Sequence, residues 1–365
     1  MRKILRNEIN QTEIKELLKE FPLDILATKE VAFSFKKARL FKVNPLKIKN
    51  PAHRHIKYPK DIYIIHSPQI LEIACFPHLV GKELEKRTTI AGEQVAKAIQ
   101  KLWLSKNKET LIYDVLRAGP SYKVYEGLKK LKIDLKRIKI RTRYKLPSYR
   151  HHNGSCGQLE IIYEDFSNLP SNKELVIIKP DTEAAAGTSH LAIKRLIEVA
   201  KEKNSKIKTI ICTGFISCVS LNVLEKLAIK NNFELKVLAW GNLTALYKNG
   251  YDMPLYGIDE AYYKETGKIR KLGAVIPKEI LGDYLKYFVC GIDQVGDWSA
   301  RQTLLYNGYG FEKGDILNHL NHSLNFIKSL YEISKNQKWF KKWQKEIFEK
   351  EIKELATALT LYDRK

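Results

Sequence analysis

The stretch from Asp181 to Ser189 carries residue types that could bind a phosphate group. Small side chains from Ala184 to Gly187 would let an anion approach the backbone N–H groups, and the hydroxyls of Thr188 and Ser189 could add hydrogen bonds. A β-branched run precedes the stretch and an apolar helical pattern follows it, so the loop would lie at a helix N-terminus, where phosphate groups bind. The alternative is a plain turn between strand and helix with a serine as the N-cap. The Gly-Lys-Ser/Thr sequence of an ATP or GTP P-loop is missing here.

An arginine and a pair of aspartates follow two other predicted strands. Arg117 comes just before Gly119 at the end of an apolar run, where a guanidinium could grip a phosphate group. An exposed loop arginine is the alternative. Asp293 and Asp297 lie in a glycine-containing turn from Gly291 to Trp298. A tight polar turn of this kind is typical of the surroundings of a binding site.

Metal-binding and disulfide patterns are weak. His53 and His55 have no acidic or thiol partner nearby, which favours a surface role over a metal site. His319 and His322 would share a helical face, but no acidic third ligand is evident. The cysteines form no CxxC pair and are odd in number, which favours reduced thiols. They are Cys75, Cys156, Cys212, Cys218 and Cys290.

The chain is long and strongly basic. Its 365 residues can form one large domain or two, and 44% of them are hydrophobic, which is enough for a full core. Lys and Arg outnumber Asp and Glu by 64 to 41, giving a net charge of +23. Such a surplus favours polyanionic ligands: nucleotides, phosphorylated sugars or nucleic acid. No signal-peptide pattern or stretch of transmembrane length is seen, so we expect a soluble, cytoplasmic protein without a membrane partner.

Strand and helix patterns alternate from residue 111 to 240, which predicts a parallel sheet flanked by helices. Strands are expected at 61–65, 111–116, 174–179, 207–212 and 235–240. Helices are expected near 8–20 and at 82–104, 121–131 and 217–229, with another after Ser189. These elements would position the three segments named above at the ends of strands.

Two strand-like segments, 137–143 and 159–163, would pair as an extended arm. The polar stretch between them, from Tyr144, has the character of a mobile loop that closes over a site. His151 and His152 in this stretch could touch an anionic ligand, although loop exposure without a function is favoured. The remaining expectations are an irregular, tyrosine-rich segment at 241–277, a late strand at 287–290, and helices from about residue 314 to the C-terminus.

Three segments, in this order, resemble motifs of the type I phosphoribosyltransferases, and within them of the uracil phosphoribosyltransferases. They are Val115-Leu116-Arg117-Ala118-Gly119, the stretch from Asp181 to Ser189, and Tyr287-Phe288-Val289-Cys290-Gly291 with Gly296-Asp297. That family has a leucine-arginine-alanine-glycine loop, a loop from Asp to Ala-Thr-Gly-Gly-Ser, and a late strand before Gly-Asp. The resemblance covers about residues 66–305. It implies the α/β fold of that family, a parallel sheet flanked by helices with a hood or arm, here with an extra C-terminal helical segment.

The resemblance also implies roles for individual residues. Asp181 would hold a ribose hydroxyl of phosphoribosyl diphosphate, whose 5′-phosphate would lie against the backbone from Ala185 to Ser189. Arg117 would hold the pyrophosphate, Mg²⁺ would neutralise it without a direct protein ligand, and residues 141–157 would form the lid. The implied catalytic residues are Asp181, Arg117 and Asp297. The implied phosphoribosyl diphosphate site is Arg117, Ala118, Gly119, Arg141, Asp181, Thr182, Glu183, Ala184, Ala185, Ala186, Gly187, Thr188 and Ser189. The implied base site is Tyr287, Phe288, Val289, Gly291, Gly296 and Asp297.

The sequence departs from the family pattern at several positions. Ala186 stands in place of the usual threonine, and Thr188 replaces a glycine. Lys179-Pro180 occupies what is usually an apolar strand end, Cys290 replaces a proline, and Trp298 replaces an arginine. These changes bear more on the identity of the base than on the sugar-phosphate chemistry.

The sequence therefore predicts a homodimeric, Mg²⁺-dependent phosphoribosyltransferase, a pentosyltransferase of pyrimidine salvage, that uses a uracil-like base. We expect an N-terminal extension at 1–60, a phosphoribosyltransferase-like domain at 61–312 with an insertion at about 241–277, and a C-terminal helical extension at 313–365. One alternative is a catalytically altered homologue that binds nucleotide as a regulator or associates with RNA. Another is a transferase that modifies a base within a larger molecule. RNA binding would weaken steeply with salt, and small-substrate turnover would not.

Overall fold

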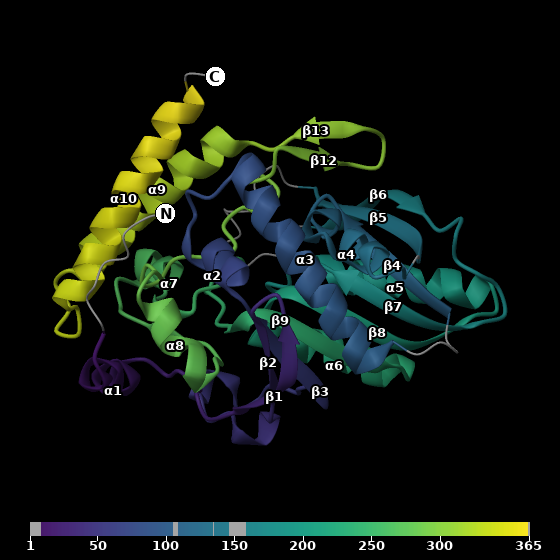
Figure 1. Ribbon diagram of the computed structural model, residues 1–365, viewed down its shortest axis with the longest axis horizontal. Coiled ribbons are helices and arrows are strands. Elements are labelled where there is room, and N and C mark those ends of the chain that lie inside the picture. The colour runs from purple at the N-terminus through teal and green to yellow at the C-terminus, as the bar shows by residue number, and fades with distance from the viewer. Residues whose placement is uncertain (1–8, 105–108, 134, 146–157, 364–365) are drawn as a thin grey trace.

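The computed structural model of the protein describes residues 9–104, 109–133, 135–145 and 158–363. A nine-stranded sheet runs through its centre in the order β1-β2-β3-β9-β8-β7-β4-β5-β6 (Figure 1). Neighbouring strands from β3 to β5 pair in parallel, whereas β1, β2 and β6 are antiparallel additions at the two edges. The predicted fold class, a largely parallel α/β sheet flanked by helices, is confirmed.

The strands of this sheet are β1 (Thr28–Phe35), β2 (Ala38–Val43), β3 (Asp61–His66), β4 (Glu109–Leu116), β5 (Lys136–Tyr144), β6 (Leu159–Asp165), β7 (Glu174–Pro180), β8 (Lys206–Ser217) and β9 (Glu234–Thr244). Two short ribbons pair β10 (Tyr256–Ile258) with β11 (Lys271–Gly273) and β12 (Leu304–Tyr306) with β13 (Phe311–Lys313). The α-helices are α1 (Gln11–Glu20), α2 (Pro68–Cys75), α3 (Gly81–Trp103), α4 (Val124–Lys130), α5 (Gly187–Glu202), α6 (Cys218–Asn231), α7 (Glu260–Thr266), α8 (Lys278–Leu285), α9 (Ile316–Ser334) and α10 (Lys342–Asp363).

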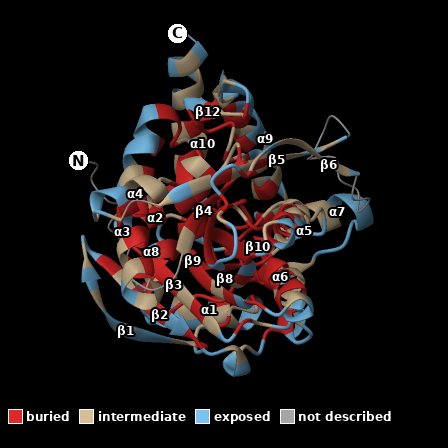
Figure 2. Ribbon diagram, turned by 90° about the vertical axis from the view of Figure 1, so that its right-hand side faces the viewer, coloured by how far each residue is buried: buried red, intermediate tan, exposed pale blue. Residues whose placement is uncertain are grey.

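The central strands are apolar on both faces because helices cover both faces. Every residue of β7 after Glu174 is buried, and β8 is buried almost throughout. Figure 2 shows α2, α3 and α4 on one side of these strands and α5 and α6 on the other. Continuous apolar runs, rather than strict alternation, are typical of parallel strands covered in this way. This pattern explains why the sequence located these strands well.

Close packing of α3 on α4 fixes the segment that follows β4. A Cβ on Gly92 would lie 2.4 Å from the carbonyl oxygen of Lys123, and one on Gly127 would lie 2.5 Å from the carbonyl oxygen of Gly92. Larger residues at either position would push the helices apart. Because α4 begins just after Arg117, this contact helps to set where that arginine stands.

The two ends of the chain join the same hydrophobic core. The antiparallel hairpin of β1 and β2 extends the sheet beyond β3. At the other end α9 and α10 pack as a pair along one side of the molecule (Figure 1). Trp339, just before α10, packs edge-on against Phe21, with ring centroids 4.9 Å apart. The domain boundaries expected from the sequence stay a prediction.

Residues 287–290 do not form the expected strand. Helix α8, which the sequence pattern did not reveal, ends at Leu285, and the chain then passes through turns to Gly291. Phe288 and Val289 are fully buried in the core without pairing to a strand. An apolar run of four residues fits a buried turn as well as a strand, so the pattern could not decide. The helix expected at 121–131 is likewise divided into a 3-10 turn, Gly119–Tyr122, and α4.

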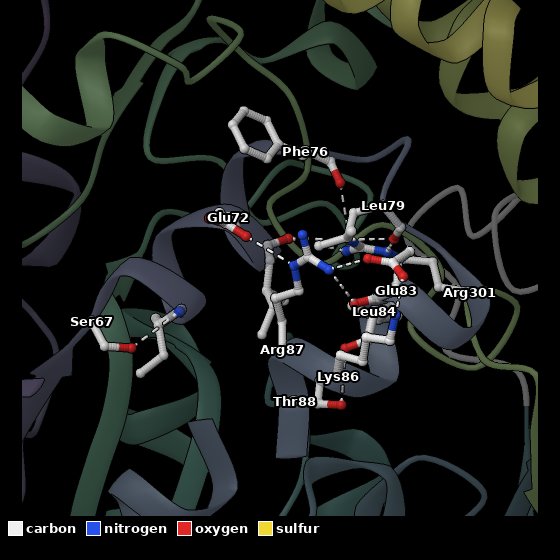
Figure 3. A network of polar contacts seen from close by, with 12 residues as sticks. Ser67, Glu72, Phe76, Leu79, Glu83, Leu84, Lys86, Arg87, Thr88 and Arg301 are labelled. Carbon is white, nitrogen blue, oxygen red and sulfur yellow. Dashed lines mark hydrogen bonds and ion pairs between the residues drawn. The ribbon is translucent and has the colours of Figure 1, made fainter. Parts of the chain in front are cut away.

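A buried arginine ties the turn after Gly296 to α2. Arg301 is fully buried and donates to the backbone carbonyl oxygens of Ile73, Phe76, Leu79 and Val295 at 2.8–3.3 Å (Figure 3). These include the carbonyls that α2 leaves unpaired at its end. Burial lowers the pKa of Arg301 to about 10. Among the described helices, none combines the length and apolar character needed to cross a membrane.

Candidate functional site

A cavity of about 750 Å³ lies at the carboxyl ends of β4, β5 and β7. Its walls are formed chiefly by residues 115–118, 141–145, 181–189 and 295–299. Carboxyl ends of parallel strands meet at one edge of a sheet, where ligand crevices form, and the volume suits a small molecule. The structure therefore brings the first motif segment, the second, and the Gly296-Asp297 part of the third to one place.

The loop between β7 and α5 exposes the start of a helix to this cavity. Ala186 adopts a left-handed conformation, with φ of 61°, and α5 begins at Gly187 without a side-chain cap among the described residues. The alternative of a serine N-cap is therefore wrong, because the Ser189 hydroxyl donates instead to Oε1 of Glu183 at 2.7 Å. Within the part of the chain that the structure describes, no side chain caps the first N–H groups of α5, and an anion satisfies such groups well.

The backbone at Asp181 is held close to β8. The Asp181 N–H donates to the carbonyl oxygen of Thr213 at 2.9 Å, and the Glu183 N–H donates to that of Phe215 at 2.8 Å. Gly214 has φ of 143°, and a Cβ there would lie 1.9 Å from the carbonyl oxygen of Asp181. Glycine is required at this position, because any side chain would displace the start of the loop.

Three charged side chains are buried beneath the loop. The ammonium of Lys179 is fully buried, 3.2 Å from Oδ2 of Asp181, and it also contacts the carboxylate of Glu183. Burial disfavours the charge on Lys179, but the two carboxylates outweigh it and hold its pKa above the ordinary value. Burial raises the pKa of Asp181 to about 6, with Lys179 lowering it and Glu183 raising it. With one ammonium and two carboxylates, these three side chains carry one net negative charge when all are ionised. The group can therefore take up a proton.

Arg117 lines the cavity at the end of β4. The peptide bond before it is cis. Its Nη1 donates to Oε1 of Glu312 on β13 at 2.5 Å. A Cβ on Gly119 would lie 2.9 Å from the carbonyl oxygen of Pro180, so a glycine lets the loop after Arg117 pack on the end of β7. Gly119 thus shapes the loop and does not line the cavity, whereas Ala118 does.

Arg141 on β5 lies beside Arg117 and is held by the same β12–β13 ribbon. Its Nη1 donates to the carbonyl oxygen of Asn307 at 3.1 Å, and its Nη2 is 4.0 Å from Oε2 of Glu312. Burial lowers the pKa of Arg141, and the positive charges of Arg117 and Arg143 lower it further against the attraction of Glu312. Several like charges gathered at one wall are typical of a site for a multiply charged anion.

The part of the wall formed by residues 293–299 combines carboxylates with an aromatic group. Burial raises the pKa of Asp297, while the N–H of Ala300 and the charge of Arg117 lower it. Oδ1 of Asp293 accepts the N–H of Met253 at 2.9 Å. The indole of Trp298 stacks on Tyr122, with ring centroids 4.7 Å apart. Carboxylate oxygens and an almost fully buried aromatic group thus border this part of the cavity.

Four residues of the implied base site lie away from the cavity lining. Phe288 and Val289 are buried in the core, Tyr287 packs edge-on against Phe76, and Gly291 lies against Leu330 and Tyr247. Because residues 287–290 form no strand, their backbone groups do not line the cavity as a strand edge would. Gly296 and Asp297 do line it.

Sequence reasoning missed one part of the wall. The segment 241–277, expected to be irregular, instead contains the end of β9 together with β10, α7 and β11. From its stretch between β9 and β10, Gly250, Tyr251 and Met253 line the cavity together with Arg143 and Lys145. The Met253 N–H, which donates to Asp293, holds this segment in place. The segment also approaches the β7–α5 loop, because a Cβ on Gly250 would lie 3.7 Å from the Cβ of Ala185. No local pattern could have revealed this, because the contacts join segments far apart in the chain.

Metal ligands are not gathered in the described part of the chain. It holds no group of three or more His, Cys, Asp or Glu side chains arranged to bind an ion. His319 contacts the carbonyl oxygen of Pro77 instead, with its Nε2 at 2.9 Å. His53 is buried, not on the surface as expected, and burial lowers its pKa to about 4. The described cysteines are buried free thiols, and Cys156 and the histidines at 151 and 152 lie outside the described residues.

Neither a protein-family model nor a curated protein matches the sequence. Among solved structures, the chain is similar to an adenine phosphoribosyltransferase from Trypanosoma brucei, with a TM-score of 0.32 and 12% identity over 51% of this chain and 87% of that one. It is also similar to adenine phosphoribosyltransferase from Thermoanaerobacter pseudethanolicus (TM-score 0.27, 19% identity, 42% of this chain and 80% of that one). Orotate phosphoribosyltransferase from Francisella tularensis gives a TM-score of 0.27 and 15% identity over 42% and 67%. Likenesses this weak assign neither a family nor an activity to the chain.

Proposed function

We propose that this protein is a phosphoribosyltransferase that moves the 5-phosphoribosyl group from phosphoribosyl diphosphate to a uracil-like pyrimidine base and releases pyrophosphate. The observation that carries the proposal is the meeting of separate sequence segments at one cavity. Three short segments that resemble one family's motifs are far apart in the sequence, yet the first, the second and the Gly296-Asp297 part of the third line the same cavity. A chance resemblance would have no reason to place Arg117, Asp181 and Asp297 around one space.

The cavity offers two separate places for negative charge. The 5′-phosphate would lie at the start of α5, against the backbone from Ala185 to Ser189. No described side chain caps the N–H groups there, and the helix dipole favours an anion. The diphosphate would lie at the wall of Arg117 and Arg141. Asp181, which also lines the cavity, would accept a ribose hydroxyl.

In the reaction the bond from C1′ of the ribose to the diphosphate oxygen breaks with its electron pair on the leaving group. The new bond joins C1′ to a ring nitrogen of the base, which loses its proton to water. Positive charge develops at C1′ in the transition state, so the nearby carboxylate of Asp181 would stabilise it, and Arg117 would stabilise the departing pyrophosphate. No strong nucleophile is needed from the protein. What the cavity must supply is charge placement and exclusion of water.

Magnesium fits this proposal as part of the substrate. Since the described residues hold no three-ligand cluster, a magnesium ion would be held mainly by diphosphate oxygens and water, with at most a carboxylate such as Asp297 nearby. When bound, it would neutralise charge on the leaving group. Dimer formation, which the resemblance implies, stays a prediction.

The base would occupy the wall of Asp293, Gly296 and Trp298, next to Tyr251 of the insertion. A ring N–H of the base would donate to a carboxylate there, and the insertion would limit the size of base that fits. The uracil-like character of the base is the part of the proposal that rests most on the sequence motifs.

A catalytically altered, nucleotide-binding regulator is the second candidate, and a specific observation favours it. The two groups meant to grip the substrate already have partners inside the chain: Asp181 contacts Lys179, and Arg117 contacts Glu312. Catalysis would require the ligand to compete with these contacts. A regulator that only binds a nucleotide would not need to release both Asp181 from Lys179 and Arg117 from Glu312.

Release of pyrophosphate tests the proposal. The full-length chain would be given phosphoribosyl diphosphate and Mg²⁺ with uracil, cytosine, orotate, adenine or hypoxanthine in turn. We expect release that depends on the base and is lost in Asp181→Asn and Arg117→Ala. Asp165→Asn is a matched control, because this carboxylate pairs with Lys139 outside the cavity lining and its loss should leave turnover unchanged.

The outcome separates the two candidates. No release with any base, together with saturable binding of phosphoribosyl diphosphate or a nucleotide, would reject the transferase and support the regulator. Binding of RNA that falls steeply between low and physiological salt would instead identify an RNA-associated protein.

A further inference from the structure

Lys179 is an unusual residue for the end of a central strand, because it is fully buried although it carries a charge. Alternate residues of a strand share a face, and residues 179, 181 and 183 continue that alternation past the end of β7. Their side chains therefore meet on one side of the chain. Lys179 itself does not line the cavity, whereas Asp181 and Glu183 do.

The contacts of this group run from the strand to the helix. The ammonium of Lys179 contacts Oδ2 of Asp181 and Oε1 of Glu183. The same Oε1 of Glu183 accepts the hydroxyl of Ser189, which lies in the first turn of α5. Oδ1 of Asp181 accepts the N–H of Thr182 at 2.8 Å. One buried cation thus connects the strand end, the loop and the helix start.

Backbone hydrogen bonds to β8 hold the start of the loop at Asp181 and Glu183, but the next three residues have no polar side chain. Residues 184–186 are alanines, whose side chains can make no hydrogen bond. The loop is tied on its outer side by the Ser217 hydroxyl, which donates to the carbonyl oxygen of Ala184 at 2.5 Å. Ala186 is held with positive φ, a conformation that non-glycine residues rarely adopt without support. A small-residue loop can bind an anion tightly only if its N–H groups are already aligned.

We infer that Lys179 is a positioning residue: through Asp181, Glu183 and Ser189 it holds the β7–α5 loop in the shape that binds the phosphate group of the ligand. The residue does not touch the ligand. Part of this inference, the identity of the ligand as a sugar phosphate, rests on the proposed function. The alignment of the loop does not, and inorganic phosphate can probe it.

Loss of Lys179 should make phosphate binding depend on pH. The groups that face Lys179 are Asp181 and Glu183 from its own segment and the Cys212 thiol from β8, with the Ser189 hydroxyl reaching Glu183 from α5. Without the ammonium, the two carboxylates face each other and repel. Protonation relieves that repulsion, so a variant that lacks Lys179 should recover phosphate binding as the pH falls. A lysine with a merely structural role would give a loss that does not change with pH in this way.

The experiment measures binding of inorganic phosphate and ribose 5-phosphate to the full-length chain by calorimetry between pH 5 and pH 8. The variants are Lys179→Met, Glu183→Gln, the double variant and Ser189→Ala. Lys203→Met is the matched control, because that lysine bonds the carbonyl oxygens of Phe166 and Leu169 at the other end of α5. We expect Lys179→Met to weaken binding by about tenfold or more at pH 8, and by much less at pH 5.

Glu183→Gln and Ser189→Ala keep the test decisive even if Lys179→Met does not fold, since each leaves Lys179 paired with Asp181. Each should weaken binding of both probes by about threefold to fivefold, the worth of one hydrogen bond. The double variant should lose less than the sum of its single changes. Unchanged affinity in Glu183→Gln and Ser189→Ala would overturn the inference. Phosphate binding without any preference for ribose 5-phosphate would overturn the proposed function and leave the positioning role supported. A wild-type chain that binds neither probe would overturn both.

Discussion

Replacing Asp181 by Asn is expected to change how the stability of the protein depends on pH. The carboxyl group is buried, and its pKa of about 6 lies well above the ordinary value of 3.8. Between these two values the folded chain holds a proton that the unfolded chain releases. Folding is therefore favoured by this group at low pH, and the contribution is lost as the pH rises through about 6. Asparagine does not titrate, so the stability of the variant should not show this decrease as the pH rises.

The size of the effect follows from the two pKa values. A pKa of about 6 against 3.8 corresponds to about 3 kcal/mol, since one pH unit is worth about 1.4 kcal/mol. Because pH 4 already lies just above 3.8, the difference in unfolding free energy, variant minus wild type, should rise by about 2.5 kcal/mol between pH 4 and pH 7.5. Effects of the substitution that do not depend on pH, including any change at Lys179, cancel from this comparison.

Urea denaturation of both proteins at pH 4, 5, 6 and 7.5 measures this difference. Asp165→Asn provides a control of opposite sign, because the Ser167 hydroxyl lowers the pKa of Asp165 and its ionised form is the stabilising one. That variant should lose stability relative to wild type as the pH rises, by a smaller amount. A difference for Asp181→Asn that stays constant from pH 4 to pH 7.5, or that falls, would refute the account of a buried, proton-accepting group.

Further variants test the assignment of the walls and the role of the buried Arg301. Arg117→Ala should abolish measurable pyrophosphate binding without lowering the unfolding free energy, and calorimetry with urea denaturation checks both. Glu312→Gln should tighten pyrophosphate binding by about threefold, because an exposed ion pair contributes under about 1 kcal/mol while an opposing charge is removed; weaker binding would contradict this. Arg301→Met should lower the unfolding free energy by about 3 kcal/mol or more, since it leaves several buried carbonyls unpaired. Tyr251→Ala should raise the KM for the base and leave that for phosphoribosyl diphosphate unchanged, with Tyr251→Phe close to wild type; an equal rise in both would place Tyr251 elsewhere.

The sheet and the meeting point of the motifs were predictable. β4, β7, β8 and β9 are β-branched apolar runs separated by helical patterns, and such alternation almost always gives a parallel sheet. Once the sheet is known, the segments after β4 and β7 must lie at one edge. The arm of β5 and β6 was also expected, and the two strands pair with Arg141 opposite Tyr163.

Other features depended on contacts that a local pattern does not contain. A lysine at a strand end predicts an exposed residue, and Lys179 is buried because two carboxylates two and four residues further on face it. Phe288 belongs to a buried turn, because no neighbouring strand is available to it. The role of Tyr251 in the wall arises from the contact of its segment with the turn at Asp293, forty residues on in the sequence.

The most direct test of the central claim is a crystal structure of the full-length chain with phosphoribosyl diphosphate and Mg²⁺. We predict the 5′-phosphate against the backbone N–H groups of residues 185–189, a ribose hydroxyl on Asp181, and the diphosphate on Arg117 after it leaves Glu312. Phosphoribosyl diphosphate bound away from this cavity, or bound in it with the diphosphate at the start of α5, would contradict the account.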